Sequence, residues 1–129
     1  MVKLNIFFAI IISFITTSCI ADEKEKIKYD LSQLNNFSYT KKDKSIHIKY
    51  QPTLESLYFS PGINIHIENE KIILEVLRCN VNKECKPDLK SEYDDQGYAN
   101  VVITQNYDTG KIFISGDREE IALDQLNQP

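Results

Sequence analysis

The chain has 129 residues, with 15 Lys and Arg side chains against 19 Asp and Glu, so its net charge at pH 7 is −4. This length leaves room for one domain. The acidic balance argues against a nucleic-acid-binding protein, which needs a basic patch or stripe to neutralise phosphates. It also argues against a polybasic anchor for anionic lipid.

The first residues are typical of an export signal. Lys3 carries the only side-chain charge before Asp22, and residues 4–15 are almost wholly apolar. That run is shorter than the ~20 residues that span a ~30 Å hydrocarbon core, and small, weakly polar residues follow it. The order predicts a signal peptide over residues 1–21, with an uncleaved anchor as the alternative. Its removal leaves 14 basic and 19 acidic side chains, a net charge of −5.

The end of this segment permits two kinds of processing. Residues 16–19, Thr-Thr-Ser-Cys, resemble the lipobox of bacterial lipoproteins, in which the cysteine becomes the lipidated first residue, although Thr16 departs from the Leu preferred there. Cleavage after Ser18 or Ala21 without lipidation is the alternative. Three cysteines tip the balance towards a lipid on Cys19, because Cys79 and Cys85 then remain as a pair. Either route predicts a bacterial periplasmic or outer-membrane-attached protein.

Residues 22–36 are expected to form a charged tether with a short helix. Asp22–Lys26 offers nothing apolar to bury. Ile27, Leu31 and Leu34 then recur at the spacing of one helical stripe, and Asn35-Asn36 would end that helix. An extended lead-in is the alternative.

Two strands and an apolar connector are predicted next. Phe37–Tyr39 forms a first strand, and Ser45–Tyr50 alternates so that every second side chain, beginning with Ile46, faces inward. The connector Leu54–Phe59 is unusually apolar for a loop. Loops normally stay polar at the surface, so this connector is expected to pack back on the protein, with a short edge strand as the alternative.

Residues 63–77 predict the β-hairpin around which the chain is organised. A two-residue loop at Asn69-Glu70 places Glu68 opposite Lys71, and it puts all six apolar residues that alternate along the two strands on one face. The second strand also carries Ile73 and Leu77 on its other face. Apolar residues on both faces favour a central strand with both faces covered. The connector is the expected cover; without it, Ile73 and Leu77 become candidate partner contacts.

Cys79 and Cys85 follow this strand and are six positions apart. In an exported chain the pair predicts a structural disulfide. A redox role is disfavoured, because the spacing is not C-x-x-C. The disulfide would tie a loop directly to the most buried strand.

The remaining residues predict further β-structure. Asp88–Gly97 is assigned as a loop, and Tyr98–Thr104 and Lys111–Ser115 as a hairpin, with Ile103 opposite Ile114 and a positive φ at Gly110. Residues from Asp117 onward are either a helix or a last strand. The fold class expected for residues 37–129 is therefore a single all-β domain, a small sandwich or roll of six to seven mostly antiparallel strands with one or two short helices.

Chemistry-bearing residues are sparse. His47 and His66 occupy outward strand positions, and they could approach each other if their strands paired, with Glu68 or Glu75 completing a metal site. Zinc ligands are usually spaced more tightly than this pair. The sequence has no recognisable nucleophile motif. We therefore expect no catalytic, metal or cofactor site, with a small metal-dependent or hydrolytic enzyme using these histidines as the alternative.

Tyrosines supply the remaining candidate surface. Tyr93, Tyr98 and Tyr107 flank two loops that we expect to be adjacent. Tyrosines on loops are well suited to binding, and the alternative is that they cap the ends of the core. The function expected is a small exported envelope protein that binds another protein without catalysis, for example an inhibitor or immunity-type protein. A passive structural lipoprotein, with a lipid on Cys19 as its only membrane contact, is a further alternative.

Overall fold

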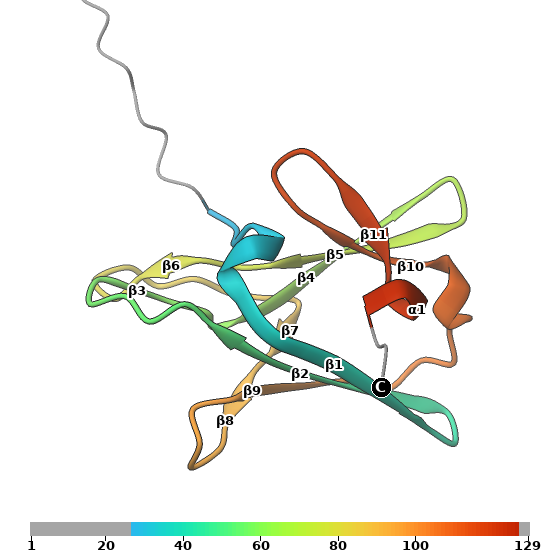
Figure 1. Ribbon diagram of the computed structural model, residues 1–129, viewed down its shortest axis with the longest axis horizontal. Coiled ribbons are helices and arrows are strands. Elements are labelled where there is room, and N and C mark those ends of the chain that lie inside the picture. Colours follow the sequence, from blue (N-terminus) through green and yellow to red (C-terminus); the bar gives the residue numbers. More distant parts are fainter. Residues whose placement is uncertain (1–26, 127–129) are drawn as a thin grey trace, which may run out of the picture.

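The structure is a computed structural model that describes residues 27–126. The predicted signal peptide, Cys19 and the charged run Asp22–Lys26 of the predicted tether lie outside these residues. Within them, none of the helices is long and apolar enough to span a membrane. The described residues form a sandwich of two β-sheets with a short two-stranded ribbon at one end (Figure 1).

The first sheet is antiparallel throughout. It is built from β1 (Leu34–Lys42), β2 (Ser45–Pro52), β9 (Ala99–Ile103) and β8 (Glu92–Tyr93), in the order β1-β2-β9-β8. The alternation in β2 has the predicted outcome, because Ile46, Ile48 and Tyr50 are all buried.

The second sheet mixes strand directions. Its order is β11 (Glu120–Ala122), β10 (Ile112–Ser115), β5 (Lys71–Val76), β4 (Gly62–Glu68) and β7 (Leu89–Lys90). Strand β10 runs parallel to β5, and the other pairs are antiparallel. The ribbon pairs β3 (Tyr58–Phe59) with β6 (Cys79–Asn80).

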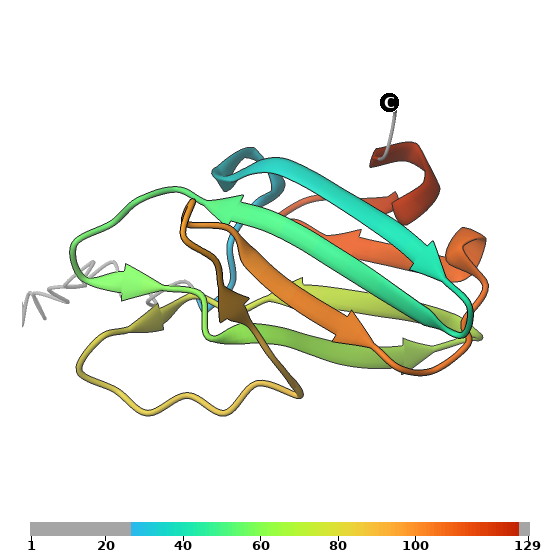
Figure 2. The same cartoon turned by 90° about the horizontal axis from the view of Figure 1, so that it is seen from below.

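The core lies between the two sheets, which Figure 2 shows as two layers. Both sheets contribute alternate, inward-facing side chains. A short helix, α1 (Leu123–Leu126), adds Leu123. The buried cluster comprises Tyr29, Leu34, Ile46, Ile48, Tyr50, Ile63, Ile72, Leu74, Val76, Ala99, Val101, Ile103, Ile112, Ile114 and Leu123.

The central hairpin has the predicted register. Ile63 lies opposite Val76, Ile65 opposite Leu74 and Ile67 opposite Ile72. Asn69 and Glu70 form the two-residue loop with φ values of 50° and 66°, the positive values that a type I′ turn requires at both positions. Strand β5 is the middle strand of its sheet, so the prediction of a central strand is confirmed.

The predicted cover for β5 is wrong. Leu54 is 92% exposed and Leu57 is 54% exposed, so neither buries Ile73 or Leu77. Ile73 is only 6% exposed because it lies between His66 of β4 and Phe113 of β10. The alternative of a short edge strand is confirmed instead, because the last two residues of the connector form β3, which pairs with β6 in the ribbon.

The predicted hairpin of residues 98–115 is also wrong. Ile103 and Ile114 are both buried, but β9 and β10 lie in different sheets. The intervening segment crosses between the layers through a 3-10 turn, η2 (Thr109–Lys111), capped where Gly110 N donates to Asp108 Oδ1 at 2.9 Å. The alternation of apolar residues therefore predicts the buried face of β9 and β10 correctly, but it does not identify the strands with which they pair. Gly110 does not have a positive φ.

Shorter elements also depart from expectation. The predicted helix is a single 3-10 turn, η1 (Leu31–Gln33), and Leu34 already begins β1. Asn36 adopts a positive φ of 52°, but it does so at a bulge within β1 rather than at a helix end. The described residues contain eleven strands, because β3, β6, β7 and β8 are two-residue strands within predicted loops or connectors. The residues after Asp117 were expected to form either a helix or a last strand, and they form both, since strand β11 is followed directly by helix α1.

The turn yields a stability prediction. Glu70 holds a left-handed conformation that costs an L side chain about 1 kcal/mol, whereas glycine is preferred there in type I′ turns. We expect Glu70→Gly to raise the free energy of unfolding by about 0.5–1 kcal/mol, measured by urea denaturation. Glu68→Gly, in the adjoining strand, should lower it by a similar amount. A destabilised Glu70→Gly chain would contradict this assignment of the turn.

Candidate functional site

The two histidines are not brought together. His47 lies on β2 in the first sheet, where its Nε2 is 3.2 Å from Ser45 Oγ. His66 lies on β4 in the second sheet, where its Nε2 is 3.3 Å from Glu75 Oε2. Residues 27–126 contain no group of three or more His, Cys, Asp or Glu side chains that could hold a metal ion. The shared metal site considered from the sequence is therefore not formed.

The three candidate tyrosines do not share one surface. Tyr98 precedes β9 and Tyr107 follows it, so they lie at opposite ends of that strand. The Tyr98 ring lies 4.5 Å from Lys49 Nζ, and Tyr107 packs against the core. The predicted loops are therefore not adjacent. Of the other two candidates, Ile73 is buried and Leu77 is half-buried, so these two offer little apolar surface.

Exposed apolar side chains gather instead at the ribbon end of the sandwich. We call this surface the apolar end and define it as Leu54, Leu57, Phe59, Val81 and Tyr93, all of which are exposed. Val81 N donates to Leu57 O at 2.9 Å and extends the β3–β6 pairing by one step. Leu54, Phe59 and Tyr93 line one pocket. In Figures 1 and 2 the ribbon projects from one end of the molecule.

The predicted disulfide is present and lies beneath this surface. Cys79, in β6, is bonded to Cys85, and Cys79 is almost fully buried. The loop between the two cysteines is further held where Asn82 N donates to Asn80 Oδ1 at 2.9 Å. Val81 sits within this closed loop, so the disulfide restricts the conformations open to it.

An ion pair holds the other side of the ribbon. Arg78 donates from Nε to Glu55 Oε1 at 2.8 Å and from Nη2 to Glu55 Oε2 at 2.5 Å. The guanidinium carbon of Arg78 lies 3.6 Å from the centre of the Tyr58 ring. Hydrogen bonds from Arg78 lower the pKa of Glu55, and the same bonds raise the pKa of Arg78. This bidentate geometry fixes the connector against β6.

Ser60 anchors Tyr93 from below. The Tyr93 hydroxyl donates to Ser60 O at 2.8 Å, and Ser91 Oγ donates to the same oxygen at 3.1 Å. Ser60 Oγ shares a 2.7 Å hydrogen bond with the hydroxyl of buried Tyr50. Burial raises the pKa of the Tyr93 hydroxyl. The polar tip of Tyr93 is therefore tied down while its ring remains exposed.

A pocket of about 150 Å³ lies at the apolar end, and we call it the Tyr29 pocket. Tyr29 is fully buried, and its hydroxyl has no hydrogen-bond partner among residues 27–126. Burial raises the pKa of this hydroxyl, and the neighbouring charge of Glu55 raises it further. Glu55 also lines the pocket. The lining residues are Tyr29, Pro52, Thr53, Leu54, Glu55, Tyr58, Phe59, Tyr93 and Gly97.

The sequence did contain a signal for this site. The apolar side chains of Leu54–Phe59 predict packing against the protein, whereas Leu54, Leu57 and Phe59 are exposed in the structure. The sequence did not predict that Tyr29 is buried, because Tyr29 is not part of the helical stripe predicted from Ile27, Leu31 and Leu34. Only Tyr93 among the predicted partner residues belongs to the apolar end.

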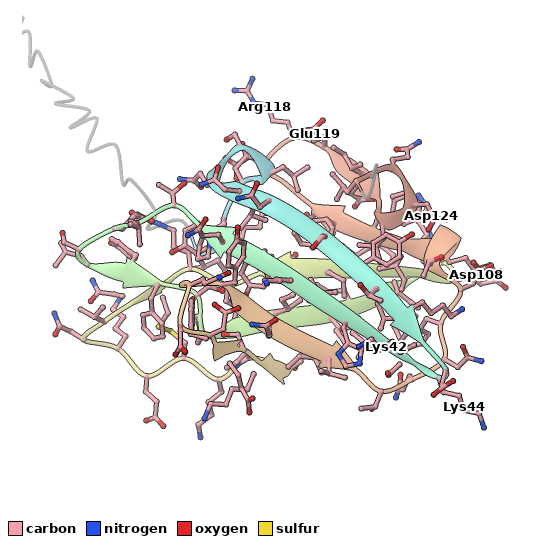
Figure 3. All side chains as sticks on the ribbon, turned by 60° about the horizontal axis from the view of Figure 1, so that its bottom comes forward. Lys42, Lys44, Asp108, Arg118, Glu119 and Asp124 are labelled. Carbon is pink, nitrogen blue, oxygen red and sulfur yellow. A yellow bond between two sulfur atoms is a disulfide. The ribbon has the colours of Figure 1, made fainter. Side chains whose placement is uncertain are left out.

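A larger hollow, of about 480 Å³, lies beside the turn between β10 and β11. Lys28 Nζ donates there to Ser115 Oγ at 3.1 Å, and Figure 3 shows Arg118 and Glu119 projecting outward from the turn. Its charged lining carries both signs, from Lys28 and Arg118 to Asp117, Glu119 and Glu120. This mixture selects no single class of charged ligand.

Comparisons with protein-family models, with curated proteins and with solved structures find no match to this chain.

The Arg78–Glu55 pair yields a pH prediction. Because the pKa of Glu55 is lowered in the folded chain, its stabilising contribution is complete above the ordinary carboxyl pKa of about 4.3 and is lost as the pH falls through the lower, folded value. We expect Glu55→Gln to reduce the free energy of unfolding by about 1–2 kcal/mol at pH 7. The deficit relative to the parent chain should shrink as the pH falls below about 4.

Urea denaturation across this pH range provides the measurement. Glu68→Gln removes an exposed carboxylate on the hairpin and should change stability little at any pH. A Glu55→Gln deficit that stayed constant down to acidic pH would show that the ion pair does not have the stated role.

Proposed function

We propose that this chain is an exported, non-enzymatic binding module that docks another protein on its apolar end. One observation carries the proposal: Leu54, Leu57, Phe59, Val81 and Tyr93 are exposed at the ribbon end of the sandwich. Leu54, Phe59 and Tyr93 line one pocket there, and Leu57 and Val81 pair through their backbones next to the ribbon. Single exposed apolar residues are ordinary on a protein surface, whereas a contiguous group marks an interaction site.

Rigidity strengthens the argument. A partner that binds a mobile loop must offset the entropy lost when the loop becomes ordered. Here the disulfide restrains Val81, the Arg78–Glu55 pair fixes the connector, and Ser60 fixes Tyr93. Binding therefore orders few additional groups, and more of the hydrophobic gain is available as affinity.

The disulfide is compatible with export, because such bonds persist in oxidising compartments. Together with the predicted signal peptide it supports a role in the bacterial envelope. An inhibitor or immunity-type protein that recognises a secreted toxin is consistent with a chain of this size. An enzyme using both histidines in one site is disfavoured, since His47 and His66 lie in different sheets.

A charge placed on the apolar end should abolish binding. We expect Leu57→Lys to remove the adduct formed in envelope extract by a photo-crosslinking residue at position 81, because burying an unpaired ammonium is costly. Ile67→Lys is the matched control, since Ile67 is 68% exposed at the hairpin turn, outside the apolar end. Adding an excess of the parent chain, which lacks the photo-crosslinking residue, should lower the adduct yield by competing for the same partner.

Absence of any saturable adduct would favour the passive structural lipoprotein. An adduct lost in Ile67→Lys and retained in Leu57→Lys would place the binding surface elsewhere. Circular dichroism should show that both variants remain folded, because both side chains are exposed.

A further inference from the structure

A groove of about 250 Å³ lies on the outward face of the first sheet, and we call it the sheet groove. Strands β1, β2 and β9 all contribute to it. The inward face of the same strands carries buried side chains such as Ile46 and Ile103. The sheet groove shares no lining residue with the apolar end or the Tyr29 pocket. Its lining residues are Ser38, Thr40, Lys42, His47, Ile48, Lys49, Asn100, Val101 and Val102.

The charge of the sheet groove is opposite to that of the chain. The chain carries a net charge of −4, yet the lining includes two lysines and a histidine and no Asp or Glu. Lys49 Nζ lies 3.7 Å from Asp94 Oδ2, so part of its charge is already neutralised. Lys42 forms no ion pair with any of residues 27–126. This lining favours an anion.

Three polar side chains stand in one row on β1. Ser38, Thr40 and Lys42 alternate along the strand, so they face the same side of the sheet at intervals of about 7 Å. The hydroxyls of Ser38 and Thr40 form no hydrogen bond with the part of the chain that the structure describes. Figure 3 shows Lys42 towards the turn end of the β1–β2 hairpin. All three groups are therefore available to a bound molecule.

The neighbouring polar residues are engaged within the protein and support the row. Thr40 lies opposite His47 in the β1–β2 register, and His47 Nε2 is 3.2 Å from Ser45 Oγ. The Asn100 amide donates to Asp94 Oδ2 at 3.3 Å. These contacts hold the β2 and β9 side of the groove, and they leave the row on β1 as its source of free donors.

The arrangement of donors favours phosphate over carboxylate. A carboxylate presents two oxygens in one plane, whereas a phosphate monoester presents three acceptor oxygens and a charge of about −1.5 to −2 at pH 7. A row of two hydroxyls and an ammonium group supplies donors for three oxygens. The groove has roughly the volume of eight water molecules, which leaves room for the group that carries the phosphate. Val102, 41% exposed, offers that group an apolar contact.

We infer that the sheet groove binds a phosphate monoester, with Ser38, Thr40 and Lys42 donating to its oxygens and Val102 contacting the attached group. Lys49 adds attraction at longer range. The site is separate from the apolar end, so this inference goes beyond the proposed function. A lipid headgroup and a soluble compound can both carry such a phosphate.

The probe is phenyl phosphate, titrated into the parent chain and followed by nuclear magnetic resonance. Saturable shifts are expected at the residues that line the sheet groove, and the affinity should fall as salt is added. Benzoate, a carboxylate on the same ring, should bind at least about fivefold more weakly. Benzyl alcohol, which is uncharged, should give no saturable shifts there.

Lys42→Gln and Lys41→Gln form a matched pair. Each removes one positive charge from an exposed position of β1, but Lys41 does not line the groove, because adjacent strand residues face opposite sides of the sheet. We expect Lys42→Gln to weaken phenyl phosphate binding about threefold to fivefold and Lys41→Gln to weaken it less than about twofold.

Thr40→Val tests the hydroxyl separately from charge. The substitution replaces the hydroxyl by a methyl group of similar size at an exposed strand position, so the variant should remain folded. Loss of the hydrogen bond should weaken phenyl phosphate binding about threefold to fivefold.

Vesicles distinguish the two sources of the phosphate. Co-sedimentation of the parent chain is compared on phosphatidylcholine vesicles with and without phosphatidic acid, which carries a phosphate monoester. An increase with phosphatidic acid that is lost in Lys42→Gln and kept in Lys41→Gln would assign the phosphate to a lipid headgroup. No increase, together with saturable phenyl phosphate binding, would assign it to a soluble compound.

Phenyl phosphate that gives no saturable shifts in the sheet groove would overturn the inference. Equal losses of affinity in Lys41→Gln and Lys42→Gln would also overturn it, since they would show attraction by overall charge alone. Benzoate binding as tight as that of phenyl phosphate, or unchanged binding in Thr40→Val, would do the same. The adduct at position 81 and its loss in Leu57→Lys do not depend on this groove, so the proposed function would stand in each case.

Discussion

Strand β5 is hydrogen-bonded on both sides, to β4 through a tight hairpin and to β10 in parallel. Side chains on both of its faces are buried, because one face meets the opposing sheet and the other is flanked by His66 and Phe113. The residues that follow this strand belong to the ribbon end. Arg78 pairs with Glu55 of the connector, and Cys79 begins β6 and forms the disulfide. The geometry of the apolar end is therefore an extension of the most constrained strand of the molecule.

Two different interactions then position the exposed side chains. Covalent and ionic links, the disulfide and the Arg78–Glu55 pair, hold the backbone of the ribbon and the connector. Hydrogen bonds to Ser60 hold Tyr93 from within the protein. In both cases a polar or covalent anchor lies beneath an apolar surface, so these side chains stay exposed without becoming mobile.

Alternation of apolar residues predicted which face of each long strand is buried, and turn length predicted the β4–β5 register, because a slip by one residue would expose the whole apolar set. The pairing of β9 and β10 was not predictable in this way. Ile103 and Ile114 face the same core whether their strands pair or lie in opposite sheets. The candidate site was harder to predict from the sequence than the fold. Leu54–Phe59 has the composition of a buried segment, and only its tertiary position shows that it is exposed.

The parallel pairing of β10 with β5 has a consequence for folding. Ile72 and Ile112, which lie opposite each other, are forty positions apart in the chain, so loop-closure entropy opposes this contact until much of the sandwich has formed. Until β10 docks, β5 presents an open apolar edge to any other unfolded chain. Correct assembly of the sandwich thus depends on how quickly the C-terminal third reaches this edge.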